Sequence, residues 1–276
     1  MPEGPEIRRE ARAIARALEA FPLARIDYRM PALADRARCL HGARIVDVTS
    51  RGKVLLIAFD AGLVHFSHNQ LYGEWRLVSP RALARLEAER GPSIRVVIAT
   101  ARRAAVLLSA TTVELLDASA VDAHPFLARI GPDVLNRTTT VPMVRARLAS
   151  PAFARRSLAS LLLDQRFLAG PGNYLRSEIL HVARVHPAAR PCDLDADALD
   201  RLARATLAVP RQSLATGGVT NERALARALA DRGATFEERR FRAYGREGKP
   251  CWTCGTRIRR VDAGRAIYIC PRCQLR

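Results

Sequence analysis

Four cysteines near the C-terminus constrain the fold of this chain more than any other feature. They form two Cys-X-X-Cys pairs, Cys251/Cys254 and Cys270/Cys273, which are separated by fifteen residues. Two such pairs can hold one Zn²⁺ ion between four thiolates, with a chance pairing or a redox dithiol as the alternatives. Four sulfur ligands leave no position for water, so a zinc ion here would be structural rather than catalytic.

The segment between the cysteine pairs predicts a β-hairpin. Apolar and polar residues alternate over 258–261 and 266–269, and Ala263-Gly264-Arg265 would form the tip. An arginine at a hairpin tip can reach a phosphate group. A solvent-exposed turn residue is the alternative for Arg265.

The rest of the chain changes its hydrophobic period twice. Residues 5–20 have the spacing of an amphipathic helix, and residues 141–232 are also helical in pattern. Between them, short β-rich segments separated by turns predict an antiparallel sandwich or barrel. The β-rich segments are 43–49, 54–59, 63–67, 74–78, 94–100, 104–109 and 113–116. A helical stretch follows over 118–136, and the helices expected after it are 141–149, 154–163, 173–182, 196–208 and 222–231.

The charge of the chain indicates a polyanionic partner. The 276 residues carry a net charge of +18, with 49% hydrophobic and 26% charged residues, as in a globular protein. Nucleic acid is the usual partner of such a charge, and an anionic membrane surface is the weaker alternative because no long apolar segment is present. The N-terminus has no secretory signal pattern, so we expect a cytosolic protein without a membrane partner.

The first residues, Met1-Pro2-Glu3-Gly4-Pro5-Glu6, have two interpretations. Removal of Met1 would make the nitrogen of Pro2 a free secondary amine, which can attack an electrophilic carbon and form an imine. Glu3 could then transfer protons. Alternatively, Pro5 and the two glutamates simply favour the start of a helix.

Three further segments combine turn residues with groups that bind phosphates or bases. Gly170-Pro171-Gly172-Asn173 precedes a predicted helix, whose first N–H groups could bind a phosphate. Ser50-Arg51-Gly52-Lys53 is a basic turn between two strands, and His68-Asn69-Gln70-Leu71-Tyr72-Gly73 could insert into a base stack. Taken alone, each is also compatible with an ordinary turn.

Together and in this order, these motifs resemble one family over essentially the whole chain. It is the bacterial DNA glycosylase family that contains formamidopyrimidine-DNA glycosylase and endonuclease VIII. The uninterrupted segment from His68 to Gly73 is similar to the endonuclease VIII branch. The resemblance implies an α+β protein: an N-terminal helix with an antiparallel β-sandwich (1–130), a helical domain with a helix–two-turns–helix motif (131–235) and a four-cysteine zinc-finger hairpin (236–276).

The resemblance also implies a role for each motif. Pro2 would be the nucleophile that forms a Schiff base, Glu3 the proton donor, and Lys53 a phosphate ligand that assists protonation. Asn173 and Arg265 would hold the phosphates beside the lesion, and Arg265 would belong to the catalytic set as well. Gln70, Leu71 and Tyr72 would fill the space left by the extruded base.

The implied activity is that of a bifunctional DNA glycosylase and AP lyase. Its substrate would be double-stranded DNA with oxidised pyrimidines or abasic sites, and the protein would be a monomer in the bacterial cytosol. The alternatives are excision of formamidopyrimidine and 8-oxoguanine, or a non-catalytic zinc-containing DNA-binding relative. Cys39 and Cys192 fit no motif, and Cys39 is a candidate for burial.

Overall fold

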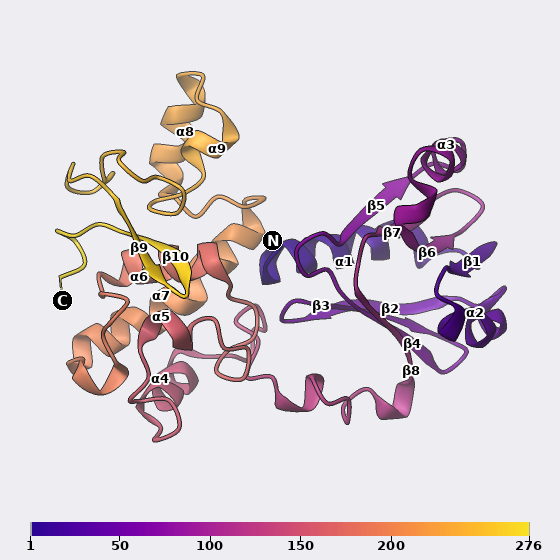
Figure 1. Cartoon of the computed structure of the whole chain (residues 1–276), viewed down its shortest axis with the longest axis horizontal. Coiled ribbons are helices and arrows are strands. Elements are labelled where there is room, and N and C mark those ends of the chain that lie inside the picture. Colours follow the sequence, from indigo (N-terminus) through magenta and orange to yellow (C-terminus); the bar gives the residue numbers. More distant parts are fainter. Residues whose placement is uncertain (1, 276) are drawn as a thin grey trace. The chain divides into compact units, whose positions relative to one another are not determined.

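The computed structural model describes residues 2–275, with the side chain of Ala263 excepted. The chain divides into two compact units, one ending at Arg129 and the other beginning at Ile130 (Figure 1). Within residues 2–275, no helix is both long enough and apolar enough to cross a membrane.

The first unit is a β-sandwich of two antiparallel four-stranded sheets. One sheet has the order β2-β3-β4-β8 and the other has the order β1-β6-β7-β5. The first sheet contains β2 (Ile45–Arg51), β3 (Val54–Phe59), β4 (Leu63–His68) and β8 (Thr112–Asp117). The second contains β1 (Arg25–Tyr28), β5 (Glu74–Val78), β6 (Ile94–Ala99) and β7 (Ala104–Leu108).

Helix α1 (Gly4–Leu18) adds an apolar stripe to this unit. Its buried residues recur at helical spacing and join the core that both sheets line: Ile7, Ala11, Ile14 and Leu18. The remaining helices are α2 (Pro31–Ala37) and α3 (Pro80–Arg90), with short 3-10 turns at Arg38–Leu40, Gly91–Ser93, Ala118–Ala120 and Leu127–Arg129.

The second unit consists of helices and one hairpin. Its helices are α4 (Val141–Ala149), α5 (Leu158–Leu161), α6 (Asn173–Ala183), α7 (Ala196–Ala215), α8 (Arg223–Asp231) and α9 (Phe236–Arg239), with a 3-10 turn at Pro191–Asp193. The strands β9 (Arg259–Ala263) and β10 (Arg265–Ile269) form the hairpin. Ile267 and Ile269 of β10 belong to the same hydrophobic core as α6 and α7, so the hairpin packs on the helices.

Several sequence predictions differ from this structure. The segment 118–136 forms only 3-10 turns, and the helix expected over 154–163 is limited to α5, because Ser157 caps a new helix start with a bond to the Ser160 N–H. Helix α7 continues past Pro210 to Ala215. Cys39 is exposed, because Leu40 takes the buried position of that turn.

Candidate functional site

A buried glutamate, Glu3, lies at the N-terminus of α1. Glu3 is the N-cap residue, and only 2% of it is exposed. Its N–H donates to Glu6 Oε2 at 3.0 Å, and Pro5 occupies the first turn, where its missing N–H costs no hydrogen bond. The helix start therefore holds Glu3 in one place, immediately after Pro2.

Helix α1 is tied to the strand that leads to Lys53. The guanidinium of Arg8 donates from Nε to Ser50 Oγ at 2.6 Å and from Nη2 to the Ser50 carbonyl at 2.8 Å. Ser50 lies near the end of β2, two residues before a tight turn to β3. Gly52 has a φ of +61° in this turn, a conformation that favours glycine. Lys53 follows it and is 8% exposed.

Strand pairing places Lys53 near the end of β4. Val54 pairs with His68 across the β3–β4 ladder, so the neighbouring Lys53 lies close to the His68 ring. Burial lowers the pKa of His68, and the charge of Lys53 lowers it further. His68 is therefore a neutral neighbour of the lysine near pH 7.

The loop after His68 presents two apolar side chains to solvent. Leu71 is 59% exposed and Tyr72 is 77% exposed, although both are large hydrophobic residues. Gln70 before them is held to β8, since its Nε2 donates to Thr112 Oγ1 at 3.0 Å. Exposed side chains on an anchored loop are suited to insertion into a partner rather than to packing in this protein.

In the second unit, Asn173 is the first residue of α6 and contacts the tip of the β9–β10 hairpin. Its Nδ2 donates to the Ala266 carbonyl at 3.0 Å. The buried Arg176 strengthens this contact, because it donates to Asn173 Oδ1 at 2.7 Å and to the Arg265 carbonyl at 2.9 Å. It also donates to the Ala159 carbonyl at 2.9 Å. One guanidinium thus links α5, α6 and the hairpin.

The turn before Asn173 is shaped by a glutamine. Gln165 Oε1 accepts from the Gly170 N–H at 3.0 Å, while its Nε2 donates to the Pro171 carbonyl at 2.9 Å. Gly172 is the N-cap residue of α6. The turn thus brings the N-terminus of α6 and Asn173 to the tip of the hairpin.

A second buried charge on α6 holds the segment that leads to the cysteines. Both carboxylate oxygens of Glu178 accept hydrogen bonds from backbone N–H groups, namely those of Arg242, Ala243 and Tyr244, at 2.8–2.9 Å. The hydroxyl of Thr220 donates to the same carboxylate at 2.6 Å. Glu178 therefore holds in place the segment 242–244, which precedes the first cysteine pair.

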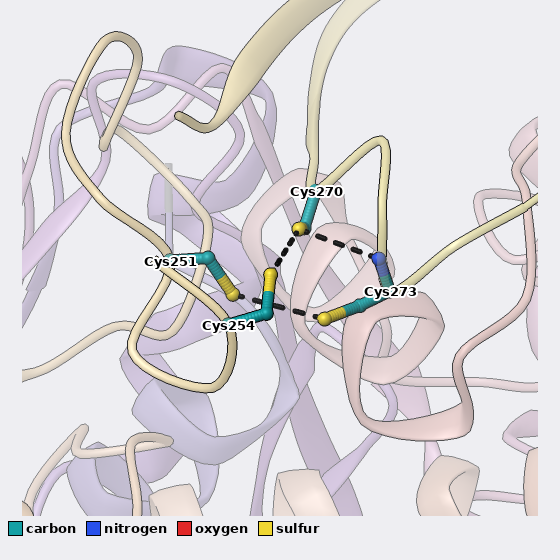
Figure 2. Close-up of side chains that lie close together, drawn as sticks. All are labelled: Cys251, Cys254, Cys270 and Cys273. Atoms are coloured by element: carbon teal, nitrogen blue, oxygen red, sulfur yellow. Dashed lines mark hydrogen bonds between the residues drawn. The ribbon is translucent and has the colours of Figure 1, made fainter. Parts of the chain in front are cut away.

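The four paired cysteines come together as the sequence predicts. Their sulfur atoms all lie within 4.8 Å of one another, and Figure 2 shows them converging on one point. The Sγ atoms of Cys254 and Cys270 are 3.4 Å apart, and those of Cys251 and Cys273 are 3.9 Å apart. A tetrahedral Zn–S distance of about 2.3 Å requires sulfur separations of about 3.8 Å. The cluster therefore fits a metal ion of this kind.

The surroundings of the cluster also suit a cation. Backbone N–H groups donate to Cys251 and Cys270 Sγ at 3.4 Å, which favours thiolates. His181 Nε2 lies 3.4 Å from Cys251 Sγ, as a group next to a metal ligand often does. Burial raises the pKa of Cys270 and Cys273, so a bound dication would be needed to hold all four sulfurs as thiolates at neutral pH.

The predicted site residues therefore fall into three groups within the described residues. Pro2, Glu3, Lys53 and the exposed loop lie on connected elements of the first unit, while Asn173 and Arg265 are joined through Arg176 in the second unit. The cysteines form the third group. The sequence motifs predict no role for Arg176 or Glu178. Charged residues inside an otherwise apolar helical pattern are the signal that could have revealed them.

Models of known protein families match parts of both units. Residues 1–113 match the model of the formamidopyrimidine-DNA glycosylase N-terminal domain, and residues 130–224 match that of the formamidopyrimidine-DNA glycosylase H2TH domain. The chain is 42% identical over 275 residues to Endonuclease 8 of Klebsiella pneumoniae and equally to that of Escherichia coli K12, covering 99% of this chain and 100% of each relative.

Solved structures share the fold over the whole length. Lactococcus lactis Fpg in complex with DNA that contains N7-benzyl-Fapy-dG superposes with a TM-score of 0.81 at 22% identity, covering 100% of both chains. The same protein bound to DNA with an abasic site gives a TM-score of 0.80 at 21% identity, covering 99% of this chain and 100% of the other. The sandwich, the helical unit and the four-cysteine hairpin, with matches over nearly all residues, show that this chain belongs to the formamidopyrimidine-DNA glycosylase family and is most similar within it to endonuclease VIII.

Proposed function

We propose that this protein is a base-excision-repair DNA glycosylase with AP lyase activity, and that it removes oxidised pyrimidines from double-stranded DNA. The observation that carries the proposal is the buried Glu3 at a helix N-cap, directly after Pro2. Once Met1 is removed, this arrangement combines a secondary amine with a carboxylate that is shielded from water. An amine nucleophile and an adjacent acid are what a Schiff-base glycosylase requires.

The chemistry follows from these two groups. The Pro2 nitrogen attacks C1′ of the damaged nucleoside, and the bond to the base breaks with its electrons going to the base. Glu3 supplies the proton to the sugar ring oxygen or to the departing base. The Pro2 nitrogen then loses its proton and the C1′–O4′ bond of the sugar breaks, with the ring oxygen taking a proton, which leaves an iminium between Pro2 and C1′. This iminium acidifies the C2′ protons, so loss of one proton expels the 3′ phosphate and a second elimination expels the 5′ phosphate. Lys53 binds the phosphate beside the lesion and assists protonation.

Asn173 and Arg265 hold the flanking phosphates in this proposal. The supporting observation is the hydrogen-bonded link from Asn173 through Arg176 to the hairpin tip, from which the exposed side chain of Arg265 extends. Zinc would be held by Cys251, Cys254, Cys270 and Cys273, where it crosslinks the two cysteine pairs. One ion per chain is expected to stabilise the hairpin without taking part in the reaction.

Oxidised pyrimidines are the preferred substrate class because of the loop from Gln70 to Tyr72. All three void-filling side chains come from this single segment, as in the endonuclease VIII branch, and the relatives at 42% identity are named Endonuclease 8. We further propose three functional segments, 1–130, 131–235 and 236–276. The protein is proposed to act as a monomer in the bacterial cytosol, associated with the nucleoid through DNA.

Borohydride trapping tests the proposal directly. The purified protein is mixed with a duplex that contains thymine glycol, with one that contains 8-oxoguanine opposite cytosine, and with one that contains an abasic site. A covalent band mainly with thymine glycol is expected. A band mainly with 8-oxoguanine would move the activity to the formamidopyrimidine class, and no band with any duplex would indicate a non-catalytic DNA-binding protein.

Two variants assign the roles. Pro2→Gly or a blocked N-terminus should suppress the covalent band, and undiminished trapping would exclude Pro2 as the nucleophile. Glu3→Gln should lose base excision but still cut a preformed abasic site at a reduced rate. Equal excision by that variant would contradict the acid role of Glu3.

A further inference from the structure

Glu10, on α1, contacts the loop that carries the exposed apolar side chains. Asn69 Nδ2 donates to Glu10 Oε2 at 2.9 Å. Asn69 is only 1% exposed and Glu10 is half-buried, so this contact is partly shielded from water. No other side-chain bond of Asn69 occurs within residues 2–275, and its Oδ1 there has no hydrogen-bond partner.

Asn69 in turn determines the shape of the loop. Its carbonyl accepts from the Gly73 N–H at 2.7 Å, which closes a tight turn around Gln70, Leu71 and Tyr72. A Cβ at Gly73 would lie 2.5 Å from that carbonyl oxygen, so the turn closes only because residue 73 is glycine. Gln70 has a φ of +49°, a conformation that a side-chain-bearing residue rarely adopts. A turn of this kind needs an anchor that holds its first residue.

We propose that Glu10 is a positioning residue for DNA repair, which acts through Asn69 to hold Gln70, Leu71 and Tyr72 in the shape that enters the duplex. The inference rests on the proposed function, because the loop matters only where a base is extruded. In this role Glu10 acts through Asn69 and not on the substrate or the reacting atoms. It links helix α1, which begins next to the nucleophile, to the loop that fills the gap.

The protonation state of Glu10 changes the hydrogen bonds that form this link. Burial, and next the negative charges of Glu6 on α1 and Glu74 on β5, raise the pKa of Glu10 to about 7, while the bond from Asn69 and the charge of Arg9 oppose the rise. An ionised Glu10 accepts one bond from Asn69 Nδ2. A protonated Glu10 also donates to Asn69 Oδ1, which completes a planar pair of two hydrogen bonds. The contact therefore consists mainly of two neutral hydrogen bonds at pH 6 and of one charge-assisted hydrogen bond at pH 8.

The chain offers variants that separate these states. Glu10→Gln can form the same two-bond pair with Asn69 at any pH, so it mimics the protonated acid. Glu10→Ala removes the pair and leaves the Asn69 side chain without an anchor. Glu19→Ala is the matched control, because Glu19 is exposed at the other end of the same helix.

The first test needs no DNA. The chain has four asparagines, so ¹⁵N-asparagine labelling gives few side-chain amide signals, and the Asn69→Ser variant assigns the relevant pair. In the wild type these protons should exchange slowly and their shift should titrate near neutral pH. In Glu10→Gln they should stay protected without titrating, and in Glu10→Ala protection should be lost. Full protection in Glu10→Ala would overturn the inference.

The second test measures function. In single-turnover reactions, Glu10→Ala should excise thymine glycol about tenfold more slowly, the loss expected from about one net hydrogen bond. The same variant should cut a preformed abasic site within threefold of the wild-type rate, because no base must be extruded. Glu10→Gln should restore excision and remove the difference between pH 6 and pH 8 that Glu10 imposes.

The outcomes also separate this inference from the proposed function. If the wild type processes neither duplex, the proposed function fails, and the amide experiment still decides whether Glu10 holds the loop. If the wild type processes both duplexes and Glu10→Ala matches it at both pH values, the positioning role fails while the proposed function stands. Loss by Glu19→Ala equal to that of Glu10→Ala would show a general effect on α1 and would also overturn the role.

Discussion

The Arg8 guanidinium lies 2.6 Å from Ser50 Oγ and 2.8 Å from the Ser50 carbonyl oxygen. This two-bonded contact joins the first two turns of α1 to the end of β2. As a result, the helix that begins after Pro2 and Glu3 and the turn that carries Lys53 cannot move independently.

We expect Arg8→Ala to weaken both base excision and strand cutting, because the proposed mechanism uses Pro2 and Lys53 in both reactions. Loss of hydrogen bonds from a charged donor should also lower the free energy of unfolding by about 1.5–3 kcal/mol. Single-turnover assays and urea unfolding measure the two effects. Arg12→Ala on the exposed face of the same helix is the control. Unchanged activity of Arg8→Ala would show that the contact is not needed to align the groups.

Arg176→Met should loosen the link between α6 and the hairpin. The variant leaves the carbonyls of Ala159 and Arg265 and the side chain of Asn173 without this donor. The expected cost is about 3 kcal/mol or more, since each unsatisfied buried acceptor costs about 1–3 kcal/mol. Thermal unfolding and DNA titration measure the loss of stability and affinity.

A conservative variant at this position separates the effect of charge from that of geometry. Arg176→Lys keeps the charge but lacks the forked geometry, so it should rescue only part of the stability and affinity. Arg223→Met, on the exposed face of α8, should change neither. Full rescue by lysine would mean that charge, rather than geometry, holds the hairpin.

Loss of metal should affect the second unit and spare the first. We expect one zinc ion per chain by metal analysis of the purified protein. Cys254→Ser or chelation should lower DNA affinity at least tenfold, because the hairpin loses its crosslink, while the β-sandwich keeps its own unfolding transition. Cys192→Ser is the control, since Cys192 is exposed and outside the cluster. Normal DNA affinity after complete metal removal would contradict a structural role for the ion.

Arg265→Ala should reduce the salt dependence of DNA binding. Removing one phosphate contact lowers the slope of log affinity against log salt by about 1, with similar weakening on all sequences. Arg260→Ala on the same hairpin is the control, because Arg260 contacts Asp262 in the free protein. Binding titrations between low and moderate salt measure the slopes, and equal slopes for wild type and Arg265→Ala would exclude the phosphate contact.

His65 should make the first unit sensitive to acid. It is fully buried beside Tyr28, whose hydroxyl lies 2.9 Å from His65 Nδ1, and burial lowers the pKa of His65 to about 3. The unfolded chain binds this proton near pH 6.5, so the stabilising contribution is present above pH 6.5 and is lost as the pH falls towards 3, by about 1.4 kcal/mol per pH unit.

Glu10 has the opposite effect on how the free energy of unfolding depends on pH. Its raised pKa stabilises the fold fully below pH 4.5, and that contribution is lost as the pH rises through about 7.

Urea unfolding of wild type and His65→Gln at pH 7 and pH 4 tests the contribution of His65. The free energy of unfolding should fall between pH 7 and pH 4 by about 3 kcal/mol less in His65→Gln than in wild type. Equal differences in the two proteins would show that His65 is protonated in the native state.

Strong local patterns made much of this fold predictable. The runs 54–59, 74–78 and 141–149 coincide with β3, β5 and α4, because strand alternation, flanking turns and helix caps all agree there. β1 was missed, since four residues carry too little pattern to separate a strand from a loop. The sequence pattern predicts a helix over 196–208, but α7 continues past Pro210 to Ala215, because tertiary packing overrides the usual helix-breaking effect of an internal proline.

The candidate site also has parts that the sequence predicts and parts that it does not. The cysteine cluster was predictable, since its spacing alone dictates the ligand geometry, and Figure 2 shows the resulting convergence. The partners of Arg176, Glu178 and Glu10 could not be predicted, because most of them are backbone groups or amides distant in sequence. Hydrogen bonds to a carbonyl leave no trace in the residue type of the acceptor.

The closed turn around Leu71 and Tyr72 has a consequence for how the protein would search DNA. The turn is already formed in the free protein, so little backbone conformational entropy remains to be lost when its side chains enter a duplex. The free-energy barrier to interrogating a base then lies in unstacking the DNA rather than in ordering the protein. A weakly stacked, damaged pair would be opened faster than an intact one, so discrimination would begin before any base reached the catalytic groups.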